Sequence, residues 1–187
     1  FPLAILLYLT RKNGMYQNRF VNGLLNIIIN VIRSTPFIIM LVCVMPLTKV
    51  LVGTRIGTKA ALVPLTIYIA PYLARLMEGA LLETKAGIIE AAEAMGATPL
   101  QIVWHFILPE SLGSLILTIT TGTIGLIGAT AMAGYIGGGG IGNIALTYGY
   151  QQFNNRLMFF TVLILIIVVQ LIQNLGTWAS AKIRRAR

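Results

Sequence analysis

Long apolar runs separated by short polar segments make up most of the chain. Four of them, over 35–53, 60–81, 111–134 and 157–178, are long enough to cross a membrane, because about 20 helical residues span roughly 30 Å of hydrocarbon. The opening run, Phe1–Leu9, is shorter, and we interpret it as the tail of a span that starts before Phe1. The pattern therefore predicts an all-α membrane protein with five transmembrane helices, the first truncated at its start, in a single domain over 1–187.

The segment Tyr16–Arg33 has a different pattern. Apolar residues recur in it at helical spacing, and asparagines occupy positions between them. This is typical of an amphipathic helix that lies along the membrane interface or packs obliquely on other helices. Ser34-Thr35-Pro36 is expected to end it, because proline disfavours helix at the preceding residue and suits the first turn of the next helix.

The longest polar segment, about 83–110, predicts two short helices. An apolar face at helical spacing identifies the first, and Gly96 follows where a left-handed cap would end it. Thr98-Pro99-Leu100-Gln101 then supplies an N-cap, a proline in the first turn and a capping-box glutamine. Pro109 is expected to close the second helix and to open the next span.

Composition places this pattern in a bilayer. With 57% hydrophobic residues, 10% charged residues and a mean hydropathy of +0.84, the chain cannot hide its apolar surface in a water-soluble fold. The net charge of +9 fits basic residues that flank apolar runs better than it fits nucleic-acid binding, so we expect contact with membrane lipid and none with nucleic acid.

The basic residues also predict orientation. If the C-terminus is cytoplasmic, ten of them lie at or near the inner side and four lie outside, which favours an outer N-terminus and a cytoplasmic C-terminus. The ten are Arg11, Lys12, Arg19, Arg33, Arg75, Lys85, Lys182, Arg184, Arg185 and Arg187, and the four are Lys49, Arg55, Lys59 and Arg156.

Residues for covalent chemistry are scarce. The chain has no Asp, five Glu near its middle, one histidine, His105, and one cysteine, Cys43. This composition excludes a Ser/His/Asp triad, an internal disulfide and a multi-cysteine metal site, and His105 has no second histidine at metal-ligand spacing. Gly137, Gly139 and Gly142 match Gly-x-Gly-x-x-Gly, but no predicted strand precedes them. We therefore predict no catalytic residue, metal or cofactor on this chain.

The polar segment carries a spaced motif. Glu90-Ala91-Ala92 is followed after three residues by Gly96, then after nine by Phe106, and after one more by Leu108-Pro109. This pattern resembles the cytoplasmic signature of ABC importer permeases, with Phe106 where that family usually has Ile. The resemblance implies the type I ABC importer transmembrane fold, in which this pair of short helices docks on a cytoplasmic ATPase. The residues it assigns to ATPase coupling are Glu90, Ala91, Ala92, Met95, Gly96, Ala97, Thr98, Pro99, Leu108 and Pro109.

The wider sequence is similar to the methionine-importer branch of that family, over segments 33–38, 70–75, 90–103 and 131–150. The resemblance implies a permease subunit of the bacterial inner membrane that carries methionine or a close derivative. Its partners would be a second copy of itself, two ATPase subunits that hold ATP and magnesium, and a periplasmic or lipid-anchored binding protein. One alternative is another amino acid or small solute. The other is an ion-coupled carrier, for which only Glu78 lies near a span.

Small and hydroxylated residues crowd the predicted span 111–134. We interpret it as lining the substrate pathway at a homodimer axis, although simple helix packing can explain any single residue. Met132 is hypothesised to be a gate, because a flexible apolar side chain can seal and repack among small neighbours. The other residues assigned to the pathway are Thr121, Gly125, Gly128 and Thr130.

A glycine-rich run follows that span. Each Gly costs about 1 kcal/mol relative to Ala inside a helix, so the run is expected to form an outer loop. Its backbone would pass close to a binding protein or a gate, or would only make a tight turn. The residues are Gly137, Gly138, Gly139, Gly140 and Gly142.

Two ionisable residues lie near the inner end of the predicted span 60–81. Arg75 and Glu78 are three residues apart, which places them on one helix face where they can form an ion pair. A proton relay is the alternative, since ionisable groups inside a membrane are costly and often functional.

Overall fold

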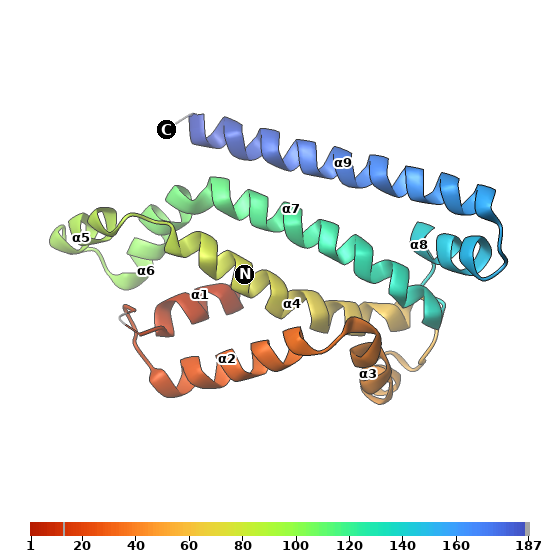
Figure 1. Ribbon diagram of the computed structural model, residues 1–187. Coiled ribbons are helices and arrows are strands. Elements are labelled where there is room, and N and C mark those ends of the chain that lie inside the picture. The colour runs from red at the N-terminus through yellow and green to blue at the C-terminus, as the bar shows by residue number, and fades with distance from the viewer. Residues whose placement is uncertain (13, 186–187) are drawn as a thin grey trace. The chain divides into compact units, whose positions relative to one another are not determined.

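The computed structural model describes residues 1–12 and 14–185, and no strand occurs among them. The all-α prediction is therefore confirmed for this part of the chain (Figure 1). The elements in order are α1 (Pro2–Thr10), α2 (Arg19–Ser34), α3 (Phe37–Val52), α4 (Thr58–Leu82), α5 (Ala86–Ala94), α6 (Pro99–Ile102), η1 (Val103–Ile107), α7 (Leu108–Ala133), η2 (Gly134–Ile136), α8 (Ile141–Ile144), η3 (Ala145–Tyr150) and α9 (Asn155–Arg185).

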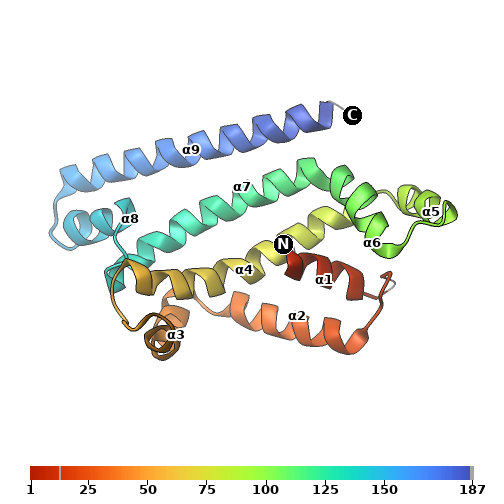
Figure 2. The same ribbon diagram turned by 180° about the vertical axis from the view of Figure 1, so that it is seen from behind.

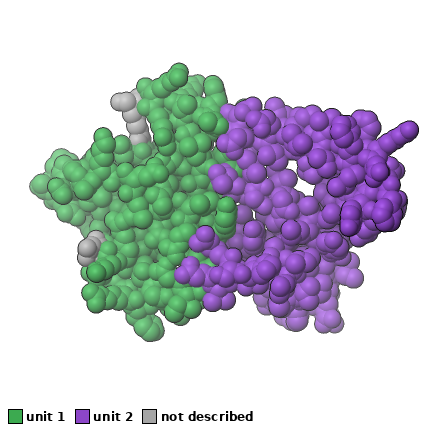
Figure 3. Space-filling model, viewed as in Figure 1, with its two compact units in different colours: residues 1–29, 72–120, 175–187 green, residues 30–71, 121–174 purple. Residues whose placement is uncertain are grey.

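Contacts divide the helices into two compact units, which Figure 3 colours separately. Unit 1 holds Phe1–Ile29, Tyr72–Thr120 and the chain from Leu175, and unit 2 holds Asn30–Pro71 and Thr121–Asn174. Because α2, α4, α7 and α9 each contribute to both units, neither unit is a continuous stretch of sequence. A single domain over 1–187 stays a prediction.

The core of unit 1 gathers side chains from seven helical elements. Leu7 of α1, Ile29 of α2 and Leu81 of α4 are almost completely buried, and Ile102 of α6 and Ile107 of η1 join the same cluster. The helices of the predicted polar segment are thus anchored by their own apolar residues to the ends of longer helices.

The core of unit 2 is built around α3. Phe37 and Leu41 are buried with Leu65 of α4 and with the small residues Ala129 and Ala133 of α7. The ring of Phe37 also meets the ring of Tyr68 edge to face, with centroids 5.2 Å apart, a favourable aromatic geometry. Small residues on α7 leave room for the larger side chains of α3.

Three helices of the described chain are long and apolar enough to cross a membrane by themselves: Thr58–Leu82, Pro99–Ile136 and Asn155–Arg185. They confirm three of the four complete spans. The fourth, predicted over 35–53, corresponds to α3, which has 16 residues and is therefore about 24 Å long. Helix α3 passes the same test only together with α2, and that pair is bent by 112°. The helix matches the predicted bounds to within two residues, and by length and hydropathy it could cross as part of this bent pair.

Both ends of α3 have a local cause. Pro36 precedes its first residue, and Gly53 ends it in the left-handed conformation with φ of 81°. The Gly53 N–H donates to the carbonyl of Lys49 at 2.9 Å, which closes the last turn.

The predicted amphipathic helix is present as α2, but two of its asparagines, Asn22 and Asn26, pack inside unit 1. The Asn22 amide donates to the Leu7 carbonyl and to the Thr10 hydroxyl, each at 3.2 Å, and the Asn26 amide donates to Asn22 Oδ1 at 2.8 Å. Large apolar residues of α2 are exposed instead, among them Phe20 at 80% and Ile27 at 64%. In a hydrocarbon solvent this inverted arrangement is favourable, because polar groups find partners within the protein.

The predicted ion pair extends this polar ladder. Arg75 donates to Glu78 at 2.7 Å and also donates to Asn26 Oδ1. The Glu78 side chain is only 9% exposed, and pairing offsets the cost of burying its charge. The observed contacts support pairing. A proton relay would need a further ionisable group beside Glu78, and the contacts observed for this pair add only Asn26.

Asn26→Leu is expected to lower the thermal stability of the purified protein, because Arg75 and Asn22 each lose a partner. Leaving such a group unsatisfied costs about 1–3 kcal/mol. The measurement is the melting temperature in detergent. Asn30→Leu is the control, since Asn30 lies one turn further along α2 with its side chain exposed. Equal melting of the Asn26 variant and the wild type would contradict the expected stabilisation.

Candidate functional site

The spaced motif folds in unit 1 as α5 followed by a sharp turn. Gly96 has φ of 77°, its N–H donates to the Glu93 carbonyl at 2.9 Å, and the Ala97 N–H donates to the Ala92 carbonyl at 3.1 Å. These two bonds form a Schellman motif, so the predicted left-handed cap is confirmed. A Cβ at Gly96 would meet no atom within 4 Å. Backbone conformation, and not crowding within the chain, therefore favours glycine here.

The second helix starts at the predicted cap. The Thr98 N–H donates to Gln101 Oε1 at 2.8 Å, and the Thr98 hydroxyl donates to the same oxygen at 2.9 Å. Gln101 thus supplies its half of the capping box, with Pro99 in the first turn. In both views α5 and α6 lie together beyond the end of α4 (Figures 1 and 2).

Pro109 does not separate this helix from the next span, so that expectation is wrong. Helix α6 continues through the π-helical turn η1 into α7, and Pro99–Ile136 forms one apolar helix. The Leu108 N–H bonds to the Val103 carbonyl, five residues back. In a regular α-helix the Pro109 ring would clash with the His105 carbonyl, and the wider π turn offers room for it.

The motif residues divide into buried and exposed sets. Ala92 is 0% exposed and packs in the cluster that contains Ile102 and Ile107, whereas Ala91 is exposed. Leu108 and Pro109 are half-buried at the start of α7. The remaining assigned residues are in the open part of the turn: Glu90, Met95, Gly96 and Thr98 are exposed, and Ala97 and Pro99 are half-buried.

Exposed apolar side chains surround the turn. Met95 is 69% exposed, Leu100 57% and Trp104 52%. Leu100 and Trp104 are four residues apart on one helical face, while Val103 and Ile107 on the other face are buried. Helical spacing in the sequence does not distinguish the buried face from the exposed one, because both faces are apolar. We call Ala91, Met95, Leu100 and Trp104 the exposed apolar face, a composition typical of a docking surface.

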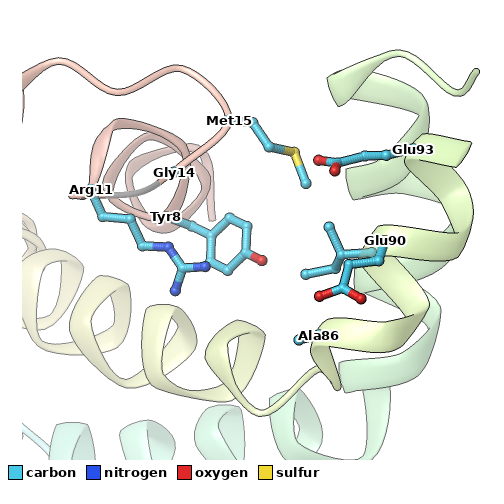
Figure 4. A pocket seen from close by; sticks show the side chains of 8 residues that line it. Tyr8, Arg11, Gly14, Met15, Ala86, Glu90 and Glu93 are labelled. Carbon is cyan, nitrogen blue, oxygen red and sulfur yellow. The ribbon is translucent and has the colours of Figure 1, made fainter.

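Glu90 faces a cavity. This cavity, of about 240 Å³, is lined by Glu90 and Glu93 of α5 and by Tyr8, Arg11 and other residues near the end of α1 (Figure 4). In the described chain no hydrogen bond or ion pair joins the Glu90 side chain to another group. Tyr8 and Arg11 were missed, because their position in sequence gives no sign that they meet α5.

The residues assigned to the pathway lie in unit 2 or at its edge on α7. Gly125, Gly128 and Met132 line one cavity of about 450 Å³, together with residues of α3 and with Tyr68 of α4. Met132 is 45% exposed. Thr121 and Thr130 are not in the lining, and the Thr130 hydroxyl donates to the Ile127 carbonyl at 2.6 Å. Sequence thus identified three of the residues that share this cavity.

The glycine run forms a tight turn against the chain itself. Gly137, Gly139 and Gly140 have positive φ. A Cβ at Gly138 would lie 2.8 Å from the Ala133 carbonyl oxygen, and one at Gly142 would lie 2.4 Å from the Ala131 Cβ. Positive φ at three of these glycines and close contacts at the other two account for the run. The helical segment that follows, α8 with η3, was not predicted from sequence.

Comparison with known proteins identifies the class. Residues 1–185 match the family of binding-protein-dependent transport system inner membrane components, and the chain belongs to this family. It is therefore a multi-pass inner-membrane component of a transport system, as its apolar helices require.

Individual relatives narrow the comparison. The chain is 45% identical over 184 residues to a probable D-methionine transport system permease protein, MetI of Vibrio cholerae, covering 98% of this chain and 80% of that protein. It is also 45% identical over 171 residues to the methionine import system permease protein MetP of Bacillus subtilis, covering 91% and 77%.

Solved structures confirm the predicted fold. A chain of the inward-facing MetNI methionine ABC transporter matches with a TM-score of 0.93 at 45% identity, covering 97% of this chain and 84% of that one. A chain of an amino acid ABC transporter with histidines matches with a TM-score of 0.74 at 16% identity, covering 96% and 81%, which shows a shared fold alone.

Proposed function

We propose that this chain is the permease subunit of an ATP-driven importer that moves methionine or a close derivative into the cytoplasm. The observation that carries the proposal is the Glu90–Pro109 motif folded as a rigid turn with an exposed apolar face. Methionine is the substrate named for the relatives and the transporter structure that match at 45% identity. Another amino acid or small solute is the competing substrate class.

The exposed apolar face is proposed to dock on a cytoplasmic ATPase subunit. Docking would remove Met95, Leu100 and Trp104 from water. The burial of their apolar surface would stabilise the complex by roughly 25 cal/mol per Å². The exposed Ala91 would permit close approach. A homodimer would bind two ATPase subunits, which would hold ATP and magnesium, and a binding protein would deliver substrate from outside. This chain would catalyse no covalent step, and its N-terminus would lie outside and its C-terminus in the cytoplasm.

The cavity beside Met132 is proposed to form part of the substrate path. It combines glycines with the aromatic rings of Phe37 and Tyr68, and such mostly apolar walls suit a thioether side chain. An ion-coupled carrier is less well supported, because Glu78 is paired with Arg75.

Met132→Ala is expected to raise ATP hydrolysis uncoupled from transport, or solute leak, because it removes the flexible side chain proposed to close the path. The measurements are ATPase rate without binding protein and efflux of preloaded methionine from vesicles. Ile119→Ala is the control, since it removes an exposed apolar side chain of the same helix outside the cavity. Unchanged rates in the Met132 variant would contradict the gate.

Reconstitution tests the function as a whole. The permease, its ATPase and its binding protein are placed in vesicles, and uptake of radiolabelled L-methionine is followed with and without ATP. Uptake should require all three components and ATP, and unlabelled D-methionine and other amino acids measure specificity by competition. Uptake without the ATPase, or transport of other solutes alone, would overturn the proposal.

A further inference from the structure

The cavity beside α5 presents opposite charges on two walls. Tyr8 lies in the last turn of α1, and Arg11 is the residue after that helix. Glu90 and Glu93 come from one face of α5 (Figure 4). Met15 reaches into the space from the segment before α2, and Ile89 completes an apolar part of the lining.

The cationic wall has donors without acceptors. The Arg11 guanidinium carbon lies 4.4 Å from the centre of the Tyr8 ring, which holds the group in place. Arg11 Nε is buried, and no acceptor for it occurs among the residues described. Tyr8 is 2% exposed, and its hydroxyl points into the cavity with no hydrogen-bond partner in the described chain (Figure 4). A buried donor such as Arg11 Nε is nearly always paired, so this wall fits an anionic group.

The opposite wall has acceptors without donors. Glu90 and Glu93 are three residues apart, and neither carboxylate is in an ion pair within the described residues. An ammonium group, with three N–H donors, fits two such carboxylates. Arg11 and Glu90 do not form an ion pair with each other, because they lie on opposite walls of the cavity. Each wall is therefore left without a partner of opposite charge within the described residues.

We propose that this cavity binds a small zwitterion, with its carboxylate or phosphate on Arg11 and Tyr8 and its primary ammonium on Glu90 and Glu93. The volume of about 240 Å³ suits a molecule of that size and lies below the roughly 300–1,000 Å³ of drug-sized sites. Two sources share this chemistry: a free amino acid and the head group of phosphatidylethanolamine. The identification of the free amino acid as methionine rests on the proposed function, whereas the inference that the cavity binds a zwitterion does not.

The test uses the permease–ATPase complex in nanodiscs of phosphatidylcholine, whose quaternary ammonium has no N–H donor. One arm measures equilibrium binding of radiolabelled L-methionine. The other adds phosphatidylethanolamine and measures the lipid retained in native mass spectra. Each arm compares wild type with Arg11→Met, Tyr8→Phe and the control Lys12→Met, which removes an adjacent exposed charge outside the cavity. The desamino analogue of methionine lacks the ammonium. Its competition with methionine on the wild-type complex tests whether binding needs that group.

A free-amino-acid site predicts that Arg11→Met loses affinity at one methionine site by about tenfold or more and Tyr8→Phe by about two- to tenfold. Lys12→Met should bind as wild type, and the desamino analogue should not compete. A lipid site predicts the same ranking for retained phosphatidylethanolamine. The proposal would be overturned if Arg11→Met changes neither methionine binding nor lipid retention. This result is expected if an ATPase side chain fills the cavity. Neither arm measures transport, so this failure is distinct from failure of the proposed function.

Discussion

Gly96→Pro is expected to abolish recovery of the permease with its ATPase and to abolish ATP-driven uptake, while the helices still insert in the membrane. Proline fixes φ near −65°, but Gly96 has φ of 77°. The substitution also removes the N–H that donates to the Glu93 carbonyl. The turn between α5 and α6 would then open, and the exposed apolar face would lose its shape. The measurement is co-purification on a tagged ATPase, with at least about a tenfold loss, equivalent to 1.4 kcal/mol.

Gly96→Asn is the control at the same position. Asparagine tolerates the left-handed conformation, and a Cβ at this site meets no atom within 4 Å. Most of the ATPase recovery should remain. Membrane insertion of both variants is checked by size-exclusion chromatography in detergent. Normal recovery with Gly96→Pro would show that this turn is not the coupling site.

Ala92→Phe is expected to lower both the melting temperature and the recovery with the ATPase. Ala92 is 0% exposed within the core of unit 1, and a ring added to a packed core costs about 1–3 kcal/mol or more. Displacement of α5 from Ile102 and Ile107 would follow. The measurements are thermal melting in detergent and co-purification on the tagged ATPase.

The neighbouring alanine separates packing from docking. Ala91 is exposed, so Ala91→Phe should leave the melting temperature unchanged but reduce co-purification by obstructing close approach to the partner. If Ala91→Phe docks normally, the exposed apolar face is not the ATPase contact. If Ala92→Phe melts and docks as wild type, the role given to its burial is wrong.

The sequence alone was sufficient for the class of fold and for the turn at the centre of the motif. Long apolar runs must become helices in hydrocarbon, because no water is present to satisfy the backbone. The cap at Gly96 and the interaction of Thr98 with Gln101 depend on residues close in sequence, so local stereochemistry determined them.

Other features were decided by contacts between residues far apart in sequence. Periodicity identified the faces of α2 but not their surroundings, because lipid and protein core are both apolar; only packing turned Asn22 and Asn26 inward. The motif assigned Ala91 and Ala92 alike to ATPase coupling, and the tertiary structure buries only Ala92. The π turn before Pro109 was also missed.

The cavity beside α5 shows the same division most clearly. The sequence determined that Glu90 belongs to a motif and that Arg11 follows an apolar run, and each statement depends only on near neighbours in the chain. The fold decided that Tyr8 and Arg11 line one space with Glu90 and Glu93. These residues, about eighty positions apart in sequence, line one cavity because of tertiary packing, and no local pattern carries that information.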